Sequence, residues 1–133
     1  MEQMVYSGDG ISKVLYTEER GKGYRLAVLN IRGSHPCAYV QFPGIEELES
    51  YDDLYMTVDD PHGGFTYLGD LEQNGLTGIW IGWDYAHYGD YTYSSFSYPV
   101  DDYGEKKYTT EEVVEEAREI LFWIKRGEFK IVK

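Results

Sequence analysis

TTEEVVEEAREILFWIKRG, residues Thr109–Gly127, carries the clearest structural signal in the chain. Thr109 and Glu112 have the spacing of a capping box, in which each side chain accepts a hydrogen bond from the other residue's backbone N–H. Gly127 stands where helices commonly end on a left-handed residue. The apolar residues between them recur at three- and four-residue intervals, as on one face of a helix: Val113, Val114, Ala117, Ile120, Leu121 and Ile124. The pattern predicts an amphipathic helix over residues 110–126.

The rest of the chain is typical of short strands joined by turns, because β-branched and aromatic runs are interrupted by glycine and proline. A hairpin is predicted within residues 13–33. Further strands are predicted at 34–44, 54–58, 65–70, 76–85, 91–100 and 128–133, with one helical turn at 45–50. The prolines that flank the strand at 34–44 predict a position near a sheet edge.

Strands followed by one helix indicate the α+β class. We expect a single domain over residues 1–133, built as a mostly antiparallel β-sheet with one C-terminal amphipathic helix packed on it. The length of 133 residues suits one domain, and the 42% of hydrophobic residues is typical of a folded protein.

The negative charge of the chain restricts the classes of partner. A formal net charge of −12 argues against binding to a nucleic-acid backbone, which requires clustered lysine and arginine. Acidity of this size chiefly serves solubility. It also leaves open the mimicry of DNA or contact with a basic protein surface.

The single cysteine and the lack of long apolar stretches indicate the cellular compartment of the protein. Cys37 is the only cysteine, so no intrachain disulfide can form. Its strand-like surroundings favour a buried, unreactive thiol. No stretch has the length of a membrane span or the features of an export signal. We therefore expect a cytoplasmic protein that does not enter a membrane.

A first loop with chemically versatile residues is DDPHGGFTY, residues 59–67. It places His62 at a turn after one strand. Gly63 and Gly64 follow, and they permit a positive φ and the close approach of a backbone or a ligand.

A second such loop is GWDYAHYGD, residues 82–90, which ends another strand. It carries Asp84, His87 and Asp90 at a three-residue spacing, and on a helical turn the three would share one face. Together with His62, these residues suit four roles. They are weak candidates for the ligands of a divalent metal, and they also suit an acid–base pair, the anchoring of a polar ligand, or a purely structural turn. The spacing alone leaves all four open, because short motif matches arise by chance.

Aromatic residues surround the second loop. Trp83, Tyr85 and Tyr88 are expected to form a wall on which a base or similar ring stacks. A longer tyrosine strip suits stacking, protein docking or ordinary packing: Tyr85, Tyr88, Tyr91, Tyr93 and Tyr98. No phosphate-binding loop, dinucleotide fingerprint or serine nucleophile motif is present in the sequence.

Over roughly residues 37–90, the motifs CAYVQFPG, YDDLYMTVDD, HGGFTY and WIGWDYAHYGDY resemble a widespread family of small uncharacterised proteins encoded by tailed phages and prophages. The matching positions are His62, Gly63, Gly64, Thr66, Gly82, Asp84, His87, Gly89 and Asp90. Two features depart from the family pattern. Trp83 replaces a commoner phenylalanine, and the segment between Pro43 and Tyr51 is shorter.

The resemblance implies a phage accessory protein, of which many counteract host defence. The first hypothesis is a protein that binds and sequesters a small polar or nucleotide-like ligand. Its expected ligand-binding residues are His62, Gly63, Gly64, Thr66, Trp83, Asp84, Tyr85, His87, Tyr88 and Asp90. The second is an acidic inhibitor that docks on a basic host defence protein, and the third is a small hydrolase using the His and Asp groups. Binding rather than turnover is expected, with no cofactor, and a homo-oligomer stays open.

Overall fold

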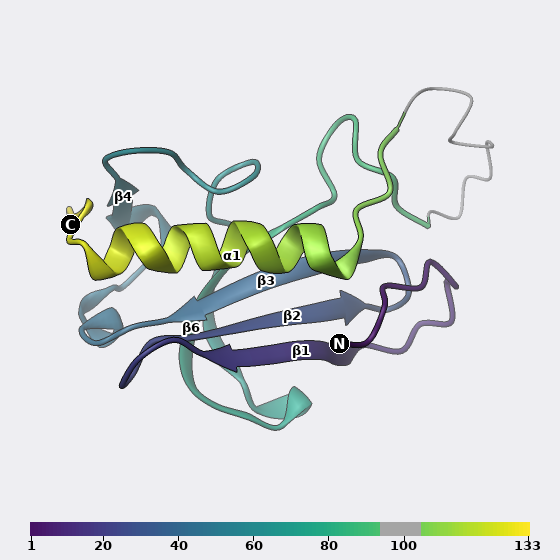
Figure 1. Cartoon of the computed structure of the whole chain (residues 1–133), viewed down its shortest axis with the longest axis horizontal. Coiled ribbons are helices and arrows are strands. Elements are labelled where there is room, and N and C mark those ends of the chain that lie inside the picture. Colours follow the sequence, from purple (N-terminus) through teal and green to yellow (C-terminus); the bar gives the residue numbers. More distant parts are fainter. Residues whose placement is uncertain (94–104) are drawn as a thin grey trace.

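The computed structural model describes residues 1–93 and 105–133 (Figure 1). Its main element is an antiparallel sheet of five strands in the order β1-β2-β3-β6-β5. The strands are β1 (Lys13–Glu19), β2 (Arg25–Ile31), β3 (His35–Gln41), β5 (Tyr67–Leu71) and β6 (Leu76–Asp84). The helix α1 (Thr110–Lys125) lies across one face of the sheet. The predicted α+β class is confirmed.

The strand expected near a sheet edge lies in the middle of the sheet. β3 pairs with β2 from His35 to Gln41 and with β6 from Cys37 to Val40. Pro36 is tolerated because it precedes the pairing with β6. Both faces of β3 are covered, since Ala38 and Val40 belong to the apolar cluster beneath α1 and Cys37 belongs to a second cluster on the opposite face.

The smaller elements also follow the predicted pattern. β4 (Leu54–Met56) pairs with β7 (Phe129–Ile131) in a separate two-stranded sheet. Short 3-10 turns occupy Ile45–Glu47, Tyr51–Asp53 and Glu72–Asn74. The strand expected at 91–100 falls mainly outside the described residues, as does Tyr98, and residues 91–93 are not in a strand.

α1 packs on β1, β2 and β3 (Figure 1), and it buries the predicted apolar stripe there. The six stripe residues are at most 3% exposed: Val113, Val114, Ala117, Ile120, Leu121 and Ile124. They pack in one cluster with Ile81 and Trp83 of β6. Burial of each valine, leucine and isoleucine side chain contributes about 1.5–3 kcal/mol relative to exposure, so this interface stabilises the fold.

Both ends of α1 are capped as the sequence indicates. The Thr109 side chain accepts the Glu112 N–H and the Glu112 side chain accepts the Thr109 N–H, which completes the capping box. At the other end Gly127 has φ 76°, and its N–H donates to the Ile124 carbonyl at 2.9 Å. The Glu128 N–H donates to the Trp123 carbonyl at 3.0 Å, which is the pattern of a Schellman motif. No helix within residues 1–93 and 105–133 is long and apolar enough to cross a membrane.

An ion pair joins α1 to the first strand. The Arg118 guanidinium donates from Nη2 to Glu18 Oε1 at 2.6 Å and from Nε to Glu18 Oε2 at 3.1 Å. The Glu18 side chain is only 16% exposed. The hydrogen bond from Arg118 lowers the pKa of Glu18 to about 2, so this carboxylate stays ionised in the folded protein well into the acid range.

We expect Ile120→Asp to unfold the domain or to lower its free energy of unfolding by at least ~3 kcal/mol. The change removes a 3%-exposed side chain from the interface and buries an unpaired carboxylate there. Phe122→Asp on the same helix is the matched control, because Phe122 is 51% exposed and its replacement should cost no more than ~1 kcal/mol. Urea denaturation followed by circular dichroism measures both. Equal losses would contradict the described packing of α1.

We expect Glu18→Gln to remove a contribution to stability that is present at neutral pH and is lost in acid. The pKa of Glu18 is lowered from 4.5 to about 2 in the folded protein, so the ionised pair stabilises the fold above about pH 4.5. That contribution is lost as the pH falls towards 2. The difference in free energy of unfolding between the unmodified protein and Glu18→Gln should therefore shrink across this window. The exposed neighbour provides the control Glu19→Gln, and a difference that stayed constant with pH would contradict the assignment.

Candidate functional site

Two glycine-containing turns present the two histidines of the predicted loops. In the first turn, the Gly64 N–H donates to the Pro61 carbonyl at 2.8 Å, and Gly63 has φ 70°. In the second turn, the Asp90 N–H donates to the His87 carbonyl at 2.9 Å, and Gly89 has φ 91°. Each glycine occupies the third position of its turn, where a positive φ favours glycine. The predicted role of glycine in shaping these loops is thus visible at Gly63 and Gly89.

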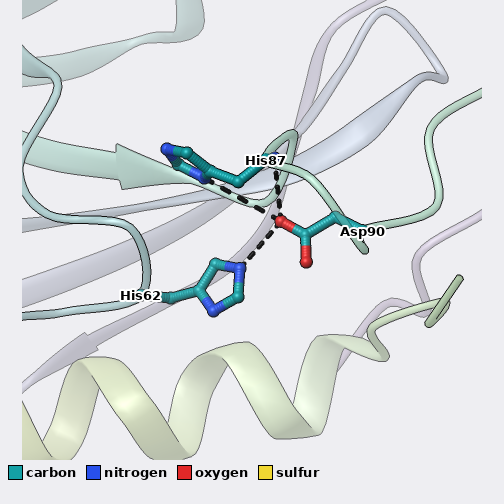
Figure 2. A group of neighbouring side chains, drawn as sticks. All are labelled: His62, His87 and Asp90. Atoms are coloured by element: carbon teal, nitrogen blue, oxygen red, sulfur yellow. Dashed lines mark hydrogen bonds and ion pairs between the residues drawn. The ribbon is translucent and has the colours of Figure 1, made fainter.

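His62, His87 and Asp90 come together where these turns meet (Figure 2). His62 Nε2 lies 2.7 Å from Asp90 Oδ2, and the same oxygen accepts the His87 backbone N–H at 3.0 Å. The two imidazole rings have centroids 5.7 Å apart. The Asp90 side chain is only 4% exposed, whereas those of His62 and His87 are 26% and 36% exposed. The two histidines thus lie side by side, and we call the three residues the His–Asp cluster.

Gly63 makes the close approach of the two loops possible. A Cβ atom at this position would overlap the His87 ring. Gly64 also has a positive φ, of 83°, but a Cβ there would meet no atom within 4 Å. The first glycine is therefore needed both for its conformation and for the space that the neighbouring imidazole fills, and the second only for its conformation.

Asp84 lies beside the His–Asp cluster at the end of β6. Its Oδ1 accepts the Ala86 N–H at 3.1 Å and lies 3.3 Å from His87 Nδ1. Its Oδ2 accepts the Thr66 hydroxyl at 3.1 Å. Asp84, His87 and Asp90 lie in an Asx turn followed by a β-turn rather than in a helical turn, and these turns still bring the three residues together.

Glu116 of α1 and Tyr108, which precedes the helix, contact His62 and its neighbour Tyr85, and the sequence analysis selected neither. The His62 ring stacks on Tyr85 with centroids 4.7 Å apart and also contacts Tyr108 at 5.2 Å. Glu116 of α1 accepts the His62 backbone N–H at 3.1 Å and the Tyr85 hydroxyl. Burial, and then the bond to Glu116, raise the pKa of Tyr85. No local pattern marks Tyr108 or Glu116, because their role depends on the packing of the helix over the loops.

The three predicted wall residues do not form a common aromatic surface. Trp83 and Tyr85 are each 1% exposed and pack beneath α1. Tyr88 points fully into solvent. The expected wall is therefore corrected: the rings that border the site are His62 and Tyr108, with Tyr85 behind them.

Two cavities adjoin the His–Asp cluster. The helix-side cavity, of about 790 Å³, has His62, Tyr85 and Tyr108 on one wall, and its remaining lining is charged: Arg20, Glu112, Glu115, Glu116, Arg118 and Glu119. The loop cavity, of about 430 Å³, is lined by Ala86, His87, Tyr88, Gly89, Asp90, Thr92 and Glu105. The cluster thus offers an imidazole to each cavity. Four glutamates against two arginines make the helix-side cavity acidic.

The remaining chemical candidates are less suited to reaction. Cys37 is buried, and burial raises the pKa of its thiol to about 12, so it is not a thiolate nucleophile near neutral pH. His35 hydrogen-bonds to the Ser34 hydroxyl at 3.0 Å and does not belong to the His–Asp cluster.

Comparison of the chain with models of known protein families, with curated proteins and with solved structures found no match. The resemblance to phage and prophage proteins therefore stays a prediction from the sequence motifs.

We expect Gly63→Ala to displace the His87 ring, whereas Gly64→Ala leaves it in place. Both changes put a side chain at a positive φ and should cost ~1–2 kcal/mol of stability for that reason. Only the alanine at position 63 would overlap the imidazole. NMR spectra of the histidine side chains measure the effect, and equal changes of the His87 signals in the two variants would contradict the close contact between the loops.

Proposed function

We propose that the protein binds a small polar ligand at the His–Asp cluster. The observation that carries the proposal is the convergence of three side chains from two separate loops. The His62 imidazole and the His87 backbone N–H contact the same buried oxygen of Asp90, His87 Nδ1 lies 3.9 Å from that oxygen, and both imidazoles remain partly exposed. Convergent polar groups beside a cavity, held on a packed scaffold, are typical of a binding site. A turn that served only its own structure would not need the second imidazole.

The helix-side cavity favours a ligand with a ring and hydrogen-bond donors. His62 and Tyr108 offer ring surfaces, on which a planar group stacks. The glutamates of the cavity accept hydrogen bonds from amino or hydroxyl groups, and they disfavour phosphates. Arg118 is already paired with Glu18 and Glu115. Among nucleotide-like ligands, we therefore propose that a nucleoside-like moiety occupies this cavity and that any phosphates lie outside it.

The sequestration of such a ligand by a phage-encoded accessory protein is the role that the motifs support. His62, Thr66, Asp84, His87 and Asp90 are positions of the resemblance, and they form one continuous set of polar contacts in the structure. This agreement favours a function located at the cluster. We propose that the protein counteracts a host defence by withholding a small polar signal, with binding rather than turnover as its activity.

A second candidate function is docking on a basic host protein. The exposed side of α1 carries Glu111, Glu112, Glu115 and Glu119, beside the 51%-exposed ring of Phe122. An acidic helix face with one apolar residue suits recognition of a basic surface. This candidate does not use the His–Asp cluster, although Glu112, Glu115 and Glu119 also line the helix-side cavity, so variants of the two histidines distinguish the two functions.

A thermal-shift and calorimetric screen of nucleosides, nucleotides, cyclic oligonucleotides and ADP-ribose derivatives tests the first proposal. We expect at least one compound to bind with affinity lowered at least ~10-fold, or ~1.4 kcal/mol, by His62→Gln and by His87→Gln. His35→Gln is the matched control, and it should leave the affinity unchanged. Chromatography of the released compound should show it intact, since a chemically altered product would instead support the hydrolase alternative.

The screen also has an outcome that would favour docking. In that outcome no compound binds, and a host protein co-purifies with the chain. The double variant Glu115→Lys and Glu119→Lys abolishes this co-purification, whereas His87→Gln leaves it unchanged. The proposed ligand site would then be wrong. The acidic face of α1 would then be the functional surface.

A further inference from the structure

One possible ligand atom from each residue of the His–Asp cluster lies within 4.8 Å of the other two. His62 Nε2 and His87 Nδ1 lie 2.7 Å and 3.9 Å from Asp90 Oδ2. Nitrogen and oxygen ligands stand about 2.0–2.2 Å from Zn²⁺, which places two ligands of one tetrahedral ion about 3.4 Å apart. The observed separations lie on either side of that value, so small side-chain rotations suffice to admit an ion. We propose that His62, His87 and Asp90 bind one divalent first-row transition-metal ion.

A second observation is the state of the His87 ring. Its Nδ1 atom is buried and has no hydrogen-bond partner among the described residues. Asp84 Oδ1 is 3.3 Å away, within ion-pair distance but without hydrogen-bond geometry. A buried polar atom without a partner costs about 1–3 kcal/mol, and such atoms in native proteins commonly mark a bound water or ion. A metal ion between the two loops would accept the Nδ1 lone pair and remove that cost.

The surroundings hold the three ligands in place before any ion binds. Stacking on Tyr85 and the backbone bond to Glu116 fix the position of His62. Asp90 is fixed by the His87 N–H, and Gly63 leaves room for the His87 ring. Outer contacts of this kind orient the ligands of a metal site and reduce the rearrangement needed for binding.

The ligand types indicate the class of metal. Two imidazole nitrogens and one carboxylate oxygen suit Zn²⁺ and its first-row neighbours, whereas Ca²⁺ and Mg²⁺ prefer oxygen ligands alone. Asp84 adds a second negative charge beside the site, but Thr66 and Ala86 already donate hydrogen bonds to its oxygens. We therefore propose that Asp84 supports the site without binding the ion. A bound metal ion would depart from the expectation, based on the sequence, that the protein has no cofactor.

Three protein ligands leave at least one coordination position for another molecule. His62 lines the helix-side cavity in which we place the ligand, so a ligand bound there lies next to the ion, and His87 and Asp90 line the loop cavity on the other side. The proposal uses the same residues as the proposed function and deepens it, because an oxygen or nitrogen of the small ligand would complete the coordination.

Calorimetric titration of the full chain with ZnCl₂ tests the site, using protein without a histidine tag in chelator-treated buffer. We expect one Zn²⁺ per chain with a Kd below about 10 µM, and a rise in Tm on addition of the ion. MgCl₂ at the same concentration should produce neither effect. Side-chain ¹⁵N NMR spectra should show Zn²⁺-dependent shifts for His62 and His87 and none for His35.

Variants identify the ligands. His62→Ala and His87→Ala should each weaken Zn²⁺ binding at least about 100-fold. Asp84→Asn should weaken it about 10-fold, because Asp84 lies beside a ligand and does not bind the ion itself. His35→Ala is the matched control and should change the Kd by less than about twofold. Circular dichroism confirms that each variant is folded, and both cluster histidines are exposed enough for their loss to leave the core intact.

The failure of this proposal can be distinguished from the failure of the proposed function. Absence of one-to-one Zn²⁺ binding, or binding unchanged in His62→Ala and His87→Ala, would overturn the metal site. An organic compound that bound the metal-free protein would then leave the proposed function standing. Zn²⁺ binding that requires both histidines, with no compound of the screen binding in its presence, would support the metal site and contradict the small-molecule proposal alone.

Discussion

The packing of α1 on the five-stranded sheet is the interaction on which the other features depend. Its apolar stripe supplies a third of the buried residues described in the apolar cluster beneath it, and Arg118 on its flank pairs with Glu18 of the first strand. The same helix reaches the candidate site through Glu116, which accepts hydrogen bonds from the His62 backbone and the Tyr85 hydroxyl. The loops of the His–Asp cluster are therefore not independent of the core. Their geometry is set by where the helix lies, so the stability of the domain and the arrangement of the site are physically coupled.

The elements that sequence reasoning located well are those with a local cause. The capping box at Thr109 and the glycine at position 127 define α1 almost to the residue, and the hairpin of β1 and β2 follows from its glycine-containing turn. The position of β3 could not be inferred in the same way. Proline near a strand end is compatible with an edge and with the start of a central strand, and only the pairing with β6 decides between them.

The candidate site was predictable in its polar residues and not in its aromatic ones. His62, His87 and Asp90 lie in glycine-containing turns, and the residue types that favour a turn can be recognised in the local sequence. Whether a ring at Trp83 or Tyr88 faces a ligand, the core or solvent depends on the sheet face and on what covers it. Tyr108 and Glu116 contribute from positions far along the chain. Spacing within one segment carries no information on such contacts.

The late position of α1 in the chain has a consequence for the synthesis of the protein. β1, β2 and β3 lie in the first third of the sequence, whereas the helix that covers their apolar face begins at Thr110. Contacts also join the two regions, since the Thr110 hydroxyl donates to the Glu2 carbonyl at 2.8 Å and the Tyr6 hydroxyl donates to the Tyr108 carbonyl at 2.8 Å. During translation the apolar side of the early strands has no partner until the helix leaves the ribosome. Apolar surface that is exposed in this way makes a partly folded chain prone to aggregation until the helix packs on the sheet.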